Sequence, residues 1–301
     1  MRLVAIIEKY FWAILIAGIM LGLWQPLPFT APHWLPALIL GTMLFLVFLK
    51  IDAIEIVEKM KNVKMMITIA LLYMIVIPLI FYAVTRVFDY EMALGIMLLT
   101  AMPAGVSTPA LADILKGNIS MTMSIVIVTQ MIAPFTVPLL FLLVGTKGLD
   151  INKLMVFKDI AIMVFLPLTL AQIAKHYLQP LISRSQHFFT SANVFLLFAF
   201  VYVAISSQRD VILDNPVSLI WKTAILYLVF IVLHFAGYFI FYRETRENRI
   251  SMAVTLAYMN NGLAIVLAST YFAPGILVLM VLSEIPWNTL LGPFRKVLNH
   301  I

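Results

Sequence analysis

The sequence has no cysteine and few charged side chains. Lys, Arg, Asp and Glu make up 11% of the 301 residues, against roughly 25% in soluble domains, while 63% of the residues are hydrophobic. The absence of cysteine excludes disulfide bonds, thiolate nucleophiles and cysteine-based metal sites. No polar interval reaches the length of about 50 residues that a small soluble domain needs. The composition therefore predicts an integral membrane protein, with the lipid bilayer as its surroundings.

Ten apolar segments are candidates for crossing a bilayer, although several are shorter than the ideal of about 20 residues and depend on tilt. They are Tyr10–Trp24, Leu35–Lys50, Met65–Arg86, Met92–Leu115, Ile119–Gly145, Ile160–Lys175, Ser191–Ser206, Ser218–Tyr242, Ile250–Phe272 and Ile276–Phe294. The sequence thus predicts an all-α, polytopic membrane protein with ten transmembrane helices.

Basic residues divide unequally between the two sides of these spans. Of the 20 Lys and Arg, 14 fall on the side that holds both termini, among them Arg2, Lys9, Lys59 and Lys61, and 6 fall on the other side. Cytoplasmic loops carry the excess of Lys and Arg, so both termini are expected in the cytoplasm, at a prokaryotic inner membrane. This bias accounts for the net charge of +6, and no basic soluble face indicates a nucleic acid partner. The oligomeric state is left open.

Short strings recur in the same order in the two halves of the chain. Ala70–Tyr73 is followed 154 residues later by Ala224–Tyr227, and Met102–Gly105 is followed 157 residues later by Met259–Gly262. Two further pairs lie 154 and 152 residues apart, namely Trp24–Leu27 with Leu178–Leu181 and Pro134–Phe135 with Pro286–Trp287. Five spans per copy is an odd number, so the copies enter the membrane in opposite directions. We expect two inverted repeats, residues 1–146 and 147–301.

Two apolar stretches at matching places in these repeats cannot be ordinary helix. Thr100–Leu115 is interrupted by two prolines, and Leu256–Ser269 contains the pair Asn260 and Asn261 followed by Gly262. Unwound main chain within a membrane is tolerated only where protein or a water-filled cavity receives the freed polar groups. Paired broken helices of this kind indicate the binding site of a transporter, where two halves alternate access to one midplane site.

The interrupted stretches supply the candidate substrate-binding residues. Ser107, Thr108 and Pro109 come from the first, and Asn260 and Asn261 from the second. Broken helices aim their positive ends at the midplane, which favours a small organic anion as the substrate. The alternative for Ser and Thr is that they bond to their own helix or to a neighbouring one.

One acidic residue, Glu284, has an uncharged apolar run on both sides. A carboxylate inside the membrane is a functional hypothesis by default. The alternative is a structural partner for His234 or for another polar group of a neighbouring helix. His234 itself is most simply a packed histidine.

These segments resemble the bile acid:sodium symporter family. The resemblance rests on PAGVSTPALADILKGNISMTMSIVIVTQMIAPFTVPLLF, on YMNNGLA after Ala257, and on Asn288, which is similar to the last residue of the family's W-H-N string. It implies a panel domain of spans one, two, six and seven and a core of spans three to five and eight to ten, with spans four and nine crossing at unwound centres. It also implies import of an organic anion coupled to sodium, and it adds Asn288 to the substrate-binding candidates.

The chain departs from the family at its sodium sites. The family's Ser-Asn pair is Thr108-Pro109 here, and the Glu and Gln of span nine are Thr255 and Met259. Sodium prefers several hard oxygen ligands, so the departures leave sodium coupling open. The candidate cation ligands are Thr108, Thr122, Gln130, Thr255 and Glu284, with Glu284 supplying the displaced charge as a sodium ligand or as a proton carrier.

Other functions share some of these features. Auxin-efflux-type carriers and cation antiporters also use inverted repeats with crossed broken helices. A membrane enzyme is not expected, because the sequence has no cluster of metal ligands, no nucleophile with a base and no cofactor motif. A non-transporting sensor would normally carry a soluble output domain.

Overall fold

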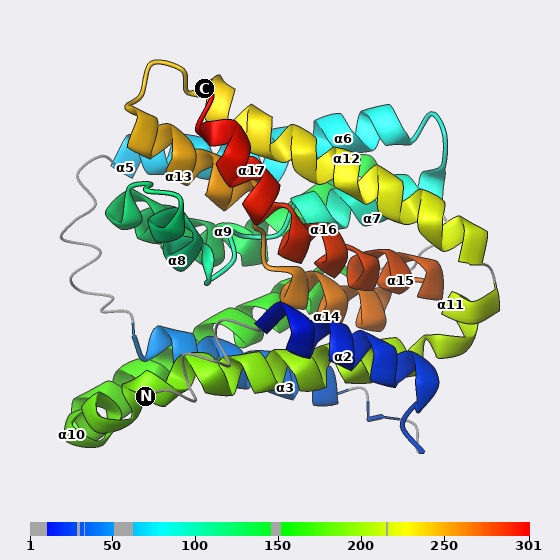
Figure 1. Ribbon diagram of the computed structural model, residues 1–301, viewed down its shortest axis with the longest axis horizontal. Helices are drawn as coiled ribbons and strands as arrows, with labels where there is room; N and C mark the ends of the chain where they lie inside the picture. Colours follow the sequence, from blue (N-terminus) through cyan, green and yellow to red (C-terminus); the bar gives the residue numbers. More distant parts are fainter. Residues whose placement is uncertain (1–10, 29–30, 33, 51–62, 146–151, 215) are drawn as a thin grey trace. The chain divides into compact units, whose positions relative to one another are not determined.

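The computed structural model describes residues 11–28, 31–32, 34–50, 63–145, 152–214 and 216–301. Arg2, Lys9, Lys59 and Lys61 lie outside these residues, as do Tyr10 at the start of the first expected span and the boundary at 146–147 between the expected repeats. Every regular element in the described part is a helix, so the prediction of an all-α fold is confirmed (Figure 1).

Four helices are long and apolar enough to cross a membrane by themselves within the described residues, or five if the bent pair at the C-terminal end counts as one span. They are Lys64–Thr85, Ile119–Val144, Lys153–Ser207 and Val217–Ile240, and the bent pair is Pro274–Thr289 with Leu291–Leu298. Fewer segments qualify than the ten expected, because the other apolar segments form short helices, are interrupted, or are merged into one long helix.

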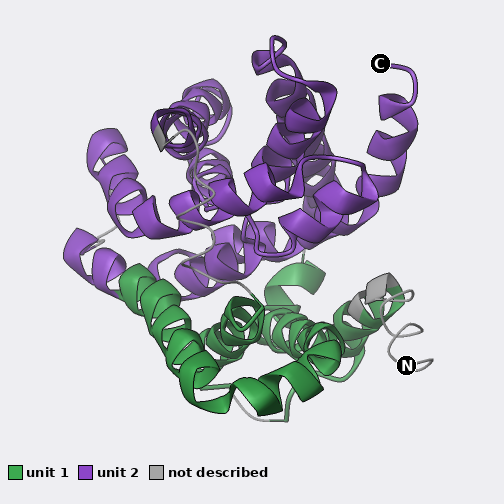
Figure 2. Cartoon of the chain, turned by 90° about the vertical axis from the view of Figure 1, so that its left-hand side faces the viewer, with its two compact units in different colours: residues 1–53, 159–214 green, residues 54–158, 215–301 purple. Residues whose placement is uncertain are grey.

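The chain divides into two compact units (Figure 2). Unit 1 contains residues 1–53 and 159–214, and unit 2 contains residues 54–158 and 215–301. Both units therefore combine segments from the first and the second half of the sequence.

In unit 1, α2 (Phe11–Trp24) packs against the second half of α10 (Lys153–Ser207). A β-carbon added at Gly22 would meet the side chain of Ile205 at 2.7 Å, so the two helices approach closely at this glycine. Tyr202 donates its hydroxyl to the carbonyl oxygen of Gln25 (3.0 Å), and Arg209 donates Nε to that of Leu23 (2.7 Å). α3 (Leu35–Phe48) and α11 (Arg209–Asp214) complete the unit.

α10 covers both the sixth and the seventh expected spans. It extends over 55 residues, but it is kinked at Leu178, which has non-helical angles (φ −120°, ψ 20°). Pro180 follows two residues later, and a proline removes a helical hydrogen bond and crowds the preceding turn. The kink therefore falls in the segment that was expected to separate two spans.

Unit 2 begins with α5 (Val63–Leu71), which continues through a π-helical turn, η1 (Leu72–Val76), into α6 (Ile77–Thr85). The turn is widened because the amide of Ile77 donates to the carbonyl oxygen of Leu72, five residues earlier, directly before Pro78. The remaining helices are α7 (Tyr90–Thr100), α8 (Thr108–Ile114), α9 (Ile119–Val144), α12 (Pro216–Ile240), α13 (Arg246–Ala257), α14 (Asn261–Tyr271), α15 (Pro274–Leu282), α16 (Glu284–Thr289) and α17 (Leu291–Leu298).

The centre of unit 2 is formed by helices whose central turns are buried on all faces. Residues 93–100 of α7 and 250–257 of α13 are all buried, as is most of α14 and α15. The side chains in these turns are mostly apolar, as expected of a helix enclosed by protein. The two helices that lead into the expected breaks are therefore the most enclosed parts of the unit.

Gly237 lets α12 pack closely against α13. A β-carbon at Gly237 would lie 2.6 Å from Cα and 2.9 Å from N of Ala253, atoms of the main chain that cannot rotate away. We expect Gly237→Ala to destabilise the protein by about 1–3 kcal/mol through overpacking. Thermal unfolding of the detergent-purified protein measures the loss.

The matched control is Gly292→Ala, because a β-carbon at this helical glycine would meet no atom within 4 Å. It should change stability by no more than about 0.5 kcal/mol. Equal unfolding temperatures for the two variants would contradict the close contact at Gly237.

Candidate functional site

The two interrupted stretches pair with one another through their main chains. α7 ends at Thr100 and α8 begins at Thr108, while α13 ends at Ala257 and α14 begins at Asn261. Between these ends Ala104 and Met259 form an isolated antiparallel bridge. The amide of Gly105 donates to the carbonyl oxygen of Tyr258 (2.8 Å), and that of Asn260 donates to the carbonyl oxygen of Pro103 (2.8 Å). We call residues 103–105 and 258–260 the crossing.

Gly105 allows the two main chains of the crossing to approach. A β-carbon at this position would lie 2.8 Å from the Tyr258 carbonyl oxygen and 3.2 Å from that of Met259. Pro103 accepts a hydrogen bond at its carbonyl oxygen and has no amide proton that needs a partner. Pro103 and Gly105, which interrupt the helix, therefore also allow the two main chains to pair.

Two side chains of α9 complete the hydrogen bonding of the crossing. The amide of Ala104 donates to Thr129 Oγ1 (3.1 Å), and Gln130 donates Nε2 to the Ala104 carbonyl oxygen (3.3 Å). Both side chains are at least 98% buried. Gln130, expected as a cation ligand, thus binds main chain here, and Thr129 is a supporting residue that the expected site did not include.

The threonines expected near a cation bond to main-chain carbonyl groups close to them in sequence. Thr108 donates to Gly105, Thr122 to Asn118 and Thr255 to Ser251, at 2.6–2.9 Å. These bonds are the helix-stitching alternative considered for the sequence. Among the described residues no hydrogen bond joins any of the three to Glu284. Ser107 directly precedes α8 and makes no side-chain capping bond, and Pro109 lies in the first turn of α8.

The adjacent residues Asn260 and Asn261 present opposite ends of their amides. Asn260 caps α14, since its Oδ1 accepts from the amide of Leu263 (3.1 Å), which leaves Nδ2 without a partner. Asn261 donates Nδ2 to Ser283 Oγ (3.0 Å), which leaves Oδ1 without a partner. Their side chains are 93% and 96% buried. One buried donor and one buried acceptor therefore follow directly after the crossing.

Glu284 lies in α16, next to the same region. It is 96% buried, and Asn288 donates Nδ2 to both its carbonyl oxygen (2.7 Å) and its Oε2 (3.2 Å). The side chain of Asn261 also contacts the Glu284 carboxyl group. No Lys, Arg or His forms a salt bridge with Glu284 in the described part of the chain. The structure thus brings together three of the expected site residues, Asn261, Glu284 and Asn288.

Trp287 ties α16 to the crossing. Its indole Nε1 donates to the carbonyl oxygen of Met259 (3.2 Å), and its ring packs edge-on against Tyr258 at a centroid distance of 5.3 Å. The sequence analysis named Trp287 only as part of a recurring string. Its indole N–H, which needs an acceptor when buried, is the feature that could have indicated this contact.

His234 of α12 packs against the crossing without bonding to Glu284. Its Nδ1 is 2.7 Å from the carbonyl oxygen of Phe230, and its ring lies edge-on to Tyr258 at 5.1 Å. Within the described residues no hydrogen bond joins it to Glu284, so the structural pair considered for the sequence is not found.

Buried polar atoms without a partner lie in the crossing and on helices next to it, α9, α12, α14 and α16. In the described residues of this region they are Gln130 Oε1, His234 Nε2, Tyr258 Oη, Asn260 Nδ2, Asn261 Oδ1 and Asn288 Oδ1. Most buried polar groups in proteins have a partner, so unpartnered groups point to a ligand or water. The arrangement is suited to binding a small polar or charged molecule.

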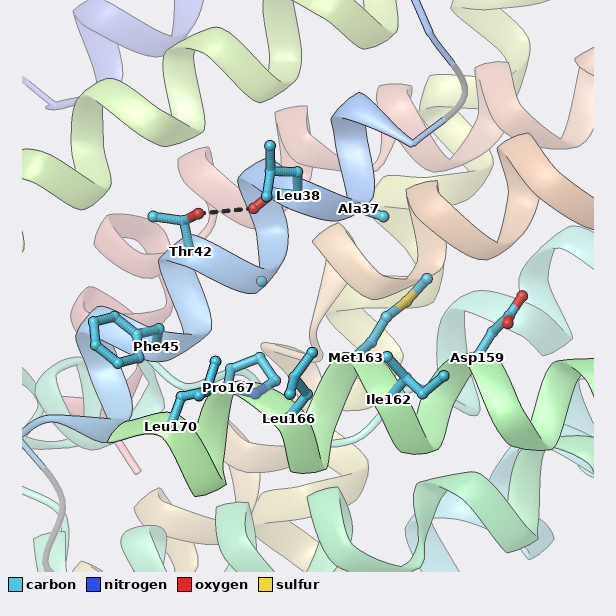
Figure 3. A pocket seen from close by; sticks show the side chains of 11 residues that line it. Ala37, Leu38, Thr42, Phe45, Asp159, Ile162, Met163, Leu166, Pro167 and Leu170 are labelled. Atoms are coloured by element: carbon cyan, nitrogen blue, oxygen red, sulfur yellow. Dashed lines mark hydrogen bonds between the residues drawn. The ribbon is translucent and has the colours of Figure 1, made fainter. Parts of the chain in front are cut away.

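Unit 1 contains a pocket of about 440 Å³ between α3 and α10. Figure 3 shows apolar side chains on both helices, including Leu38, Phe45, Leu166 and Leu170, and the hydroxyl of Thr42 is already bonded to the Leu38 carbonyl oxygen. None of the expected site residues lines this pocket, so we place the candidate site at the crossing in unit 2.

A family profile supports the resemblance noted in the sequence. It describes the SBF-like CPA transporter family and matches residues 9–286, which is most of the chain. The chain belongs to the SBF-like CPA transporter family. The predicted resemblance to bile acid:sodium symporters is thereby confirmed, and the family is one of membrane transporters.

Two relatives of this SBF-like chain come from Bacillus subtilis (strain 168). The "Uncharacterized sodium-dependent transporter YocS" is 23% identical over 214 residues, which are 67% of this chain and 62% of YocS. The "Uncharacterized protein YbaS" is 24% identical over 211 residues, 68% of each chain. The match thus spans less than two thirds of YocS.

Thr129 provides a test of how this SBF-like chain supports its crossing. Thr129→Val keeps the shape of the side chain but leaves the buried amide of Ala104 without an acceptor. We expect a loss of about 1–3 kcal/mol in stability, the cost of an unsatisfied buried donor. Thermal unfolding in detergent measures it.

Thr136→Val is the control on the same helix. Thr136 is 96% buried and donates to Ile132 of its own helix, so its removal leaves no main-chain amide unpaired. A Thr129 variant as stable as the Thr136 variant would show that the bond to Ala104 contributes nothing.

Proposed function

We propose that the protein is a secondary active transporter that moves a small organic anion by alternating access. The observation that carries this proposal is the crossing, where non-helical main chain from the two halves of the sequence meets inside a buried apolar unit. Broken helices that meet in this way form the substrate sites of several transporter folds.

The geometry of the crossing supports two inverted repeats. Ala104 and Met259 are 155 positions apart, within the range of 152–157 that separates the recurring strings. The bond from Gly105 to Tyr258 and the bond from Asn260 to Pro103 exchange places under the same shift of 155 positions. We infer a pseudo-twofold axis at the crossing that relates repeats 1–146 and 147–301, with ten spans in total.

The two compact units support a division into panel and core. Unit 1 holds the first, second, sixth and seventh expected spans, and unit 2 holds the third to fifth and the eighth to tenth. In this proposal unit 1 is the panel and unit 2 is the core that carries the substrate. Both termini face the cytoplasm, and the membrane is the inner membrane of a prokaryote.

Asn260 is the proposed anchor for the anion. Its unpartnered Nδ2 is a buried donor directly before the first turn of α14, where the helix dipole is positive. Ser107, Thr108 and Pro109 lie at the matching end of the other broken helix. No Lys or Arg belongs to the crossing, so amide groups rather than a cationic side chain would meet the substrate.

A cation gradient is the proposed source of energy. Glu284 is the buried carboxyl group closest in sequence to this region, and it has no cationic partner among the described residues. The name of YocS states sodium dependence for that relative. For this chain we propose Glu284 as the coupling residue, which binds a cation or carries a proton.

Uptake into proteoliposomes tests the transport proposal. A panel of radiolabelled carboxylates and sulfonates is offered with an inward sodium gradient, with a proton gradient and with neither. Accumulation of at least one anion under one gradient is expected. Indifference of every anion to both gradients, with protein of normal stability, would reject secondary active transport.

Asn260→Asp tests the anchor without removing the helix cap. Aspartate caps helices as well as asparagine, so the bond to Leu263 is retained while the free donor is replaced by a negatively charged oxygen. We expect uptake of the anion to fall at least tenfold, because the donor is lost and like charges repel.

Asn152→Asp is the matched control. Asn152 also accepts two amide hydrogen bonds at the start of a helix, from Leu154 and Met155, but it is exposed. This variant should transport normally. Full uptake by the Asn260 variant would place the anion elsewhere.

A further inference from the structure

Unit 1 has a second pocket, of about 450 Å³, where the chain leaves α2 and where α10 ends. One wall is apolar and consists of residues that follow α2, namely Pro26, Leu27, Pro28 and Ala31. The other wall is polar and consists of residues at the end of α10 and the start of α11, namely Ser206, Ser207, Arg209 and Asp210. A pocket with one charged wall and one apolar wall suits an ion that carries an apolar group.

Hydrogen bonds hold the two walls of this pocket together. Tyr202 of α10 donates its hydroxyl to the carbonyl oxygen of Gln25 (3.0 Å), directly before the apolar wall. Arg209 donates Nε to the carbonyl oxygen of Leu23 (2.7 Å), which belongs to the last turn of α2, where a helix leaves its carbonyl groups without internal donors. Walls that are fixed before a ligand enters lose little conformational entropy on binding.

Arg209 has more donors than partners. A guanidinium group has five N–H bonds, of which Nε uses one on Leu23 and Nη1 uses one on Asp210 (3.1 Å). No further partner of Arg209 is found among the described residues, so three of the five N–H bonds remain. The side chain of Asp210 is 89% exposed, and an ion pair this exposed holds the guanidinium group only weakly.

Ser206 adds a hydroxyl group without a partner. Its Oγ is buried and forms no hydrogen bond within the described part of the chain, and Ser206 lines the pocket. The neighbouring Ser207 differs, because its Oγ already donates to the carbonyl oxygen of Ala204 (2.8 Å). Buried polar groups normally have partners, so an unpartnered hydroxyl group in a pocket wall points to a ligand or water.

We propose that this pocket binds an oxyanion that carries an apolar group. The charged oxygens are bound by Arg209 and Ser206, and the apolar group packs against the wall of Pro26, Leu27 and Pro28. Guanidinium groups bind carboxylate and phosphate through paired N–H bonds. Asp210 opposes the anion, but its exposure lets water and salt screen its charge.

This pocket rests on the transport function proposed above and lies apart from the proposed substrate-binding residues. All of its residues belong to unit 1, whereas the crossing belongs to unit 2. Arg209 is one of the 6 basic residues on the side opposite to the termini, which is the outer side in the proposed topology. The pocket is then a first binding site for anions that approach from outside. The phosphate group of a phospholipid has the same chemistry.

Equilibrium dialysis with radiolabelled benzoate tests the pocket, because benzoate joins a carboxylate to an apolar ring. The full-length chain is purified in uncharged detergent and carries Asn260→Asp, which disables the proposed anchor near the crossing. Saturable binding with a Kd of about 1 mM or tighter is expected, since charge-assisted donors meet the carboxylate. Benzyl alcohol, the uncharged relative, should not compete.

Four variants on this background assign the binding to residues. Arg209→Gln should abolish it, whereas Lys158→Gln, which removes an exposed charge outside the pocket, should leave it unchanged. Ser206→Ala should raise the Kd about tenfold without lowering Tm, because Ser206 Oγ has no partner to lose. Ser207→Ala is the matched control and should keep the Kd, because the Ser207 hydroxyl proton is used within its own helix.

Asp210→Asn gives a readout that a merely structural role would not produce. Removal of the negative charge beside the guanidinium group should tighten benzoate binding roughly two- to fivefold. If Arg209→Gln fails to fold, Ser206→Ala and Asp210→Asn decide the question, because they are expected to change the Kd in opposite directions.

Lipid nanodiscs distinguish the two sources of the oxyanion. Benzoate binding is measured in phosphatidylcholine alone and in phosphatidylcholine with phosphatidylglycerol. Equal binding in both assigns the pocket to a soluble organic anion. Weaker binding with phosphatidylglycerol, together with retention of that lipid by the unaltered chain but not by Arg209→Gln, assigns the pocket to a phospholipid. Either result supports the oxyanion site.

The proposal is overturned by any of three results. They are no saturable binding of benzoate, equal competition by benzyl alcohol, or an unchanged Kd in the Arg209, Ser206 and Asp210 variants.

Failure of the pocket and failure of the transport function can be told apart, because binding is measured without transport. Benzoate binding that depends on Arg209, without gradient-driven uptake of any anion, rejects the transport function and keeps the pocket. Gradient-driven uptake without such binding keeps the function and rejects the pocket. Uptake whose KM rises in Arg209→Gln while kcat is unchanged supports both.

Discussion

A main-chain amide or carbonyl group that leaves a helix inside an apolar interior must find another partner. Unit 2 meets this requirement by pairing its two broken helices with each other. The bonds between Gly105 and Tyr258 and between Asn260 and Pro103 pair the main chains of the two unwound segments. Thr129 and Gln130 of α9 bond to the amide and the carbonyl group of Ala104. Each unpaired group would cost several kcal/mol in hydrocarbon. The breaks are therefore stable only as a pair.

The same requirement concentrates polar side chains near the crossing. A cap, Asn260, follows one break directly, and Asn261 reaches Ser283 on the adjoining helix. Trp287 donates to Met259, so the helix that carries Glu284 is fixed to the crossing. Residues needed to hold the main chain thus place a carboxylate and free amide groups in one buried region. Structural support and the proposed ligand binding thus share this set of residues.

This member of the SBF-like CPA transporter family differs from the bile acid:sodium symporters at the residues that the resemblance implies for sodium binding. The span-nine acid of those symporters is Thr255 in this chain, and its hydroxyl bonds to its own helix. Among the described residues the buried acid is Glu284, which lies in α16.

The sequence by itself determined the membrane class, the all-α fold and the places where helices break, since composition, Pro103, Pro109 and the Asn pair act locally. It also drew attention to Glu284, because a lone acid in an apolar run is costly wherever it lies. Only the tertiary structure decided that Thr129 and Gln130 form hydrogen bonds with the main chain of Ala104. It also decided that Asn260 keeps a donor without a partner, while Asn261 keeps an acceptor without one. These roles depend on which partner each hydrogen-bonding atom has, and the partners come from helices far away in the chain.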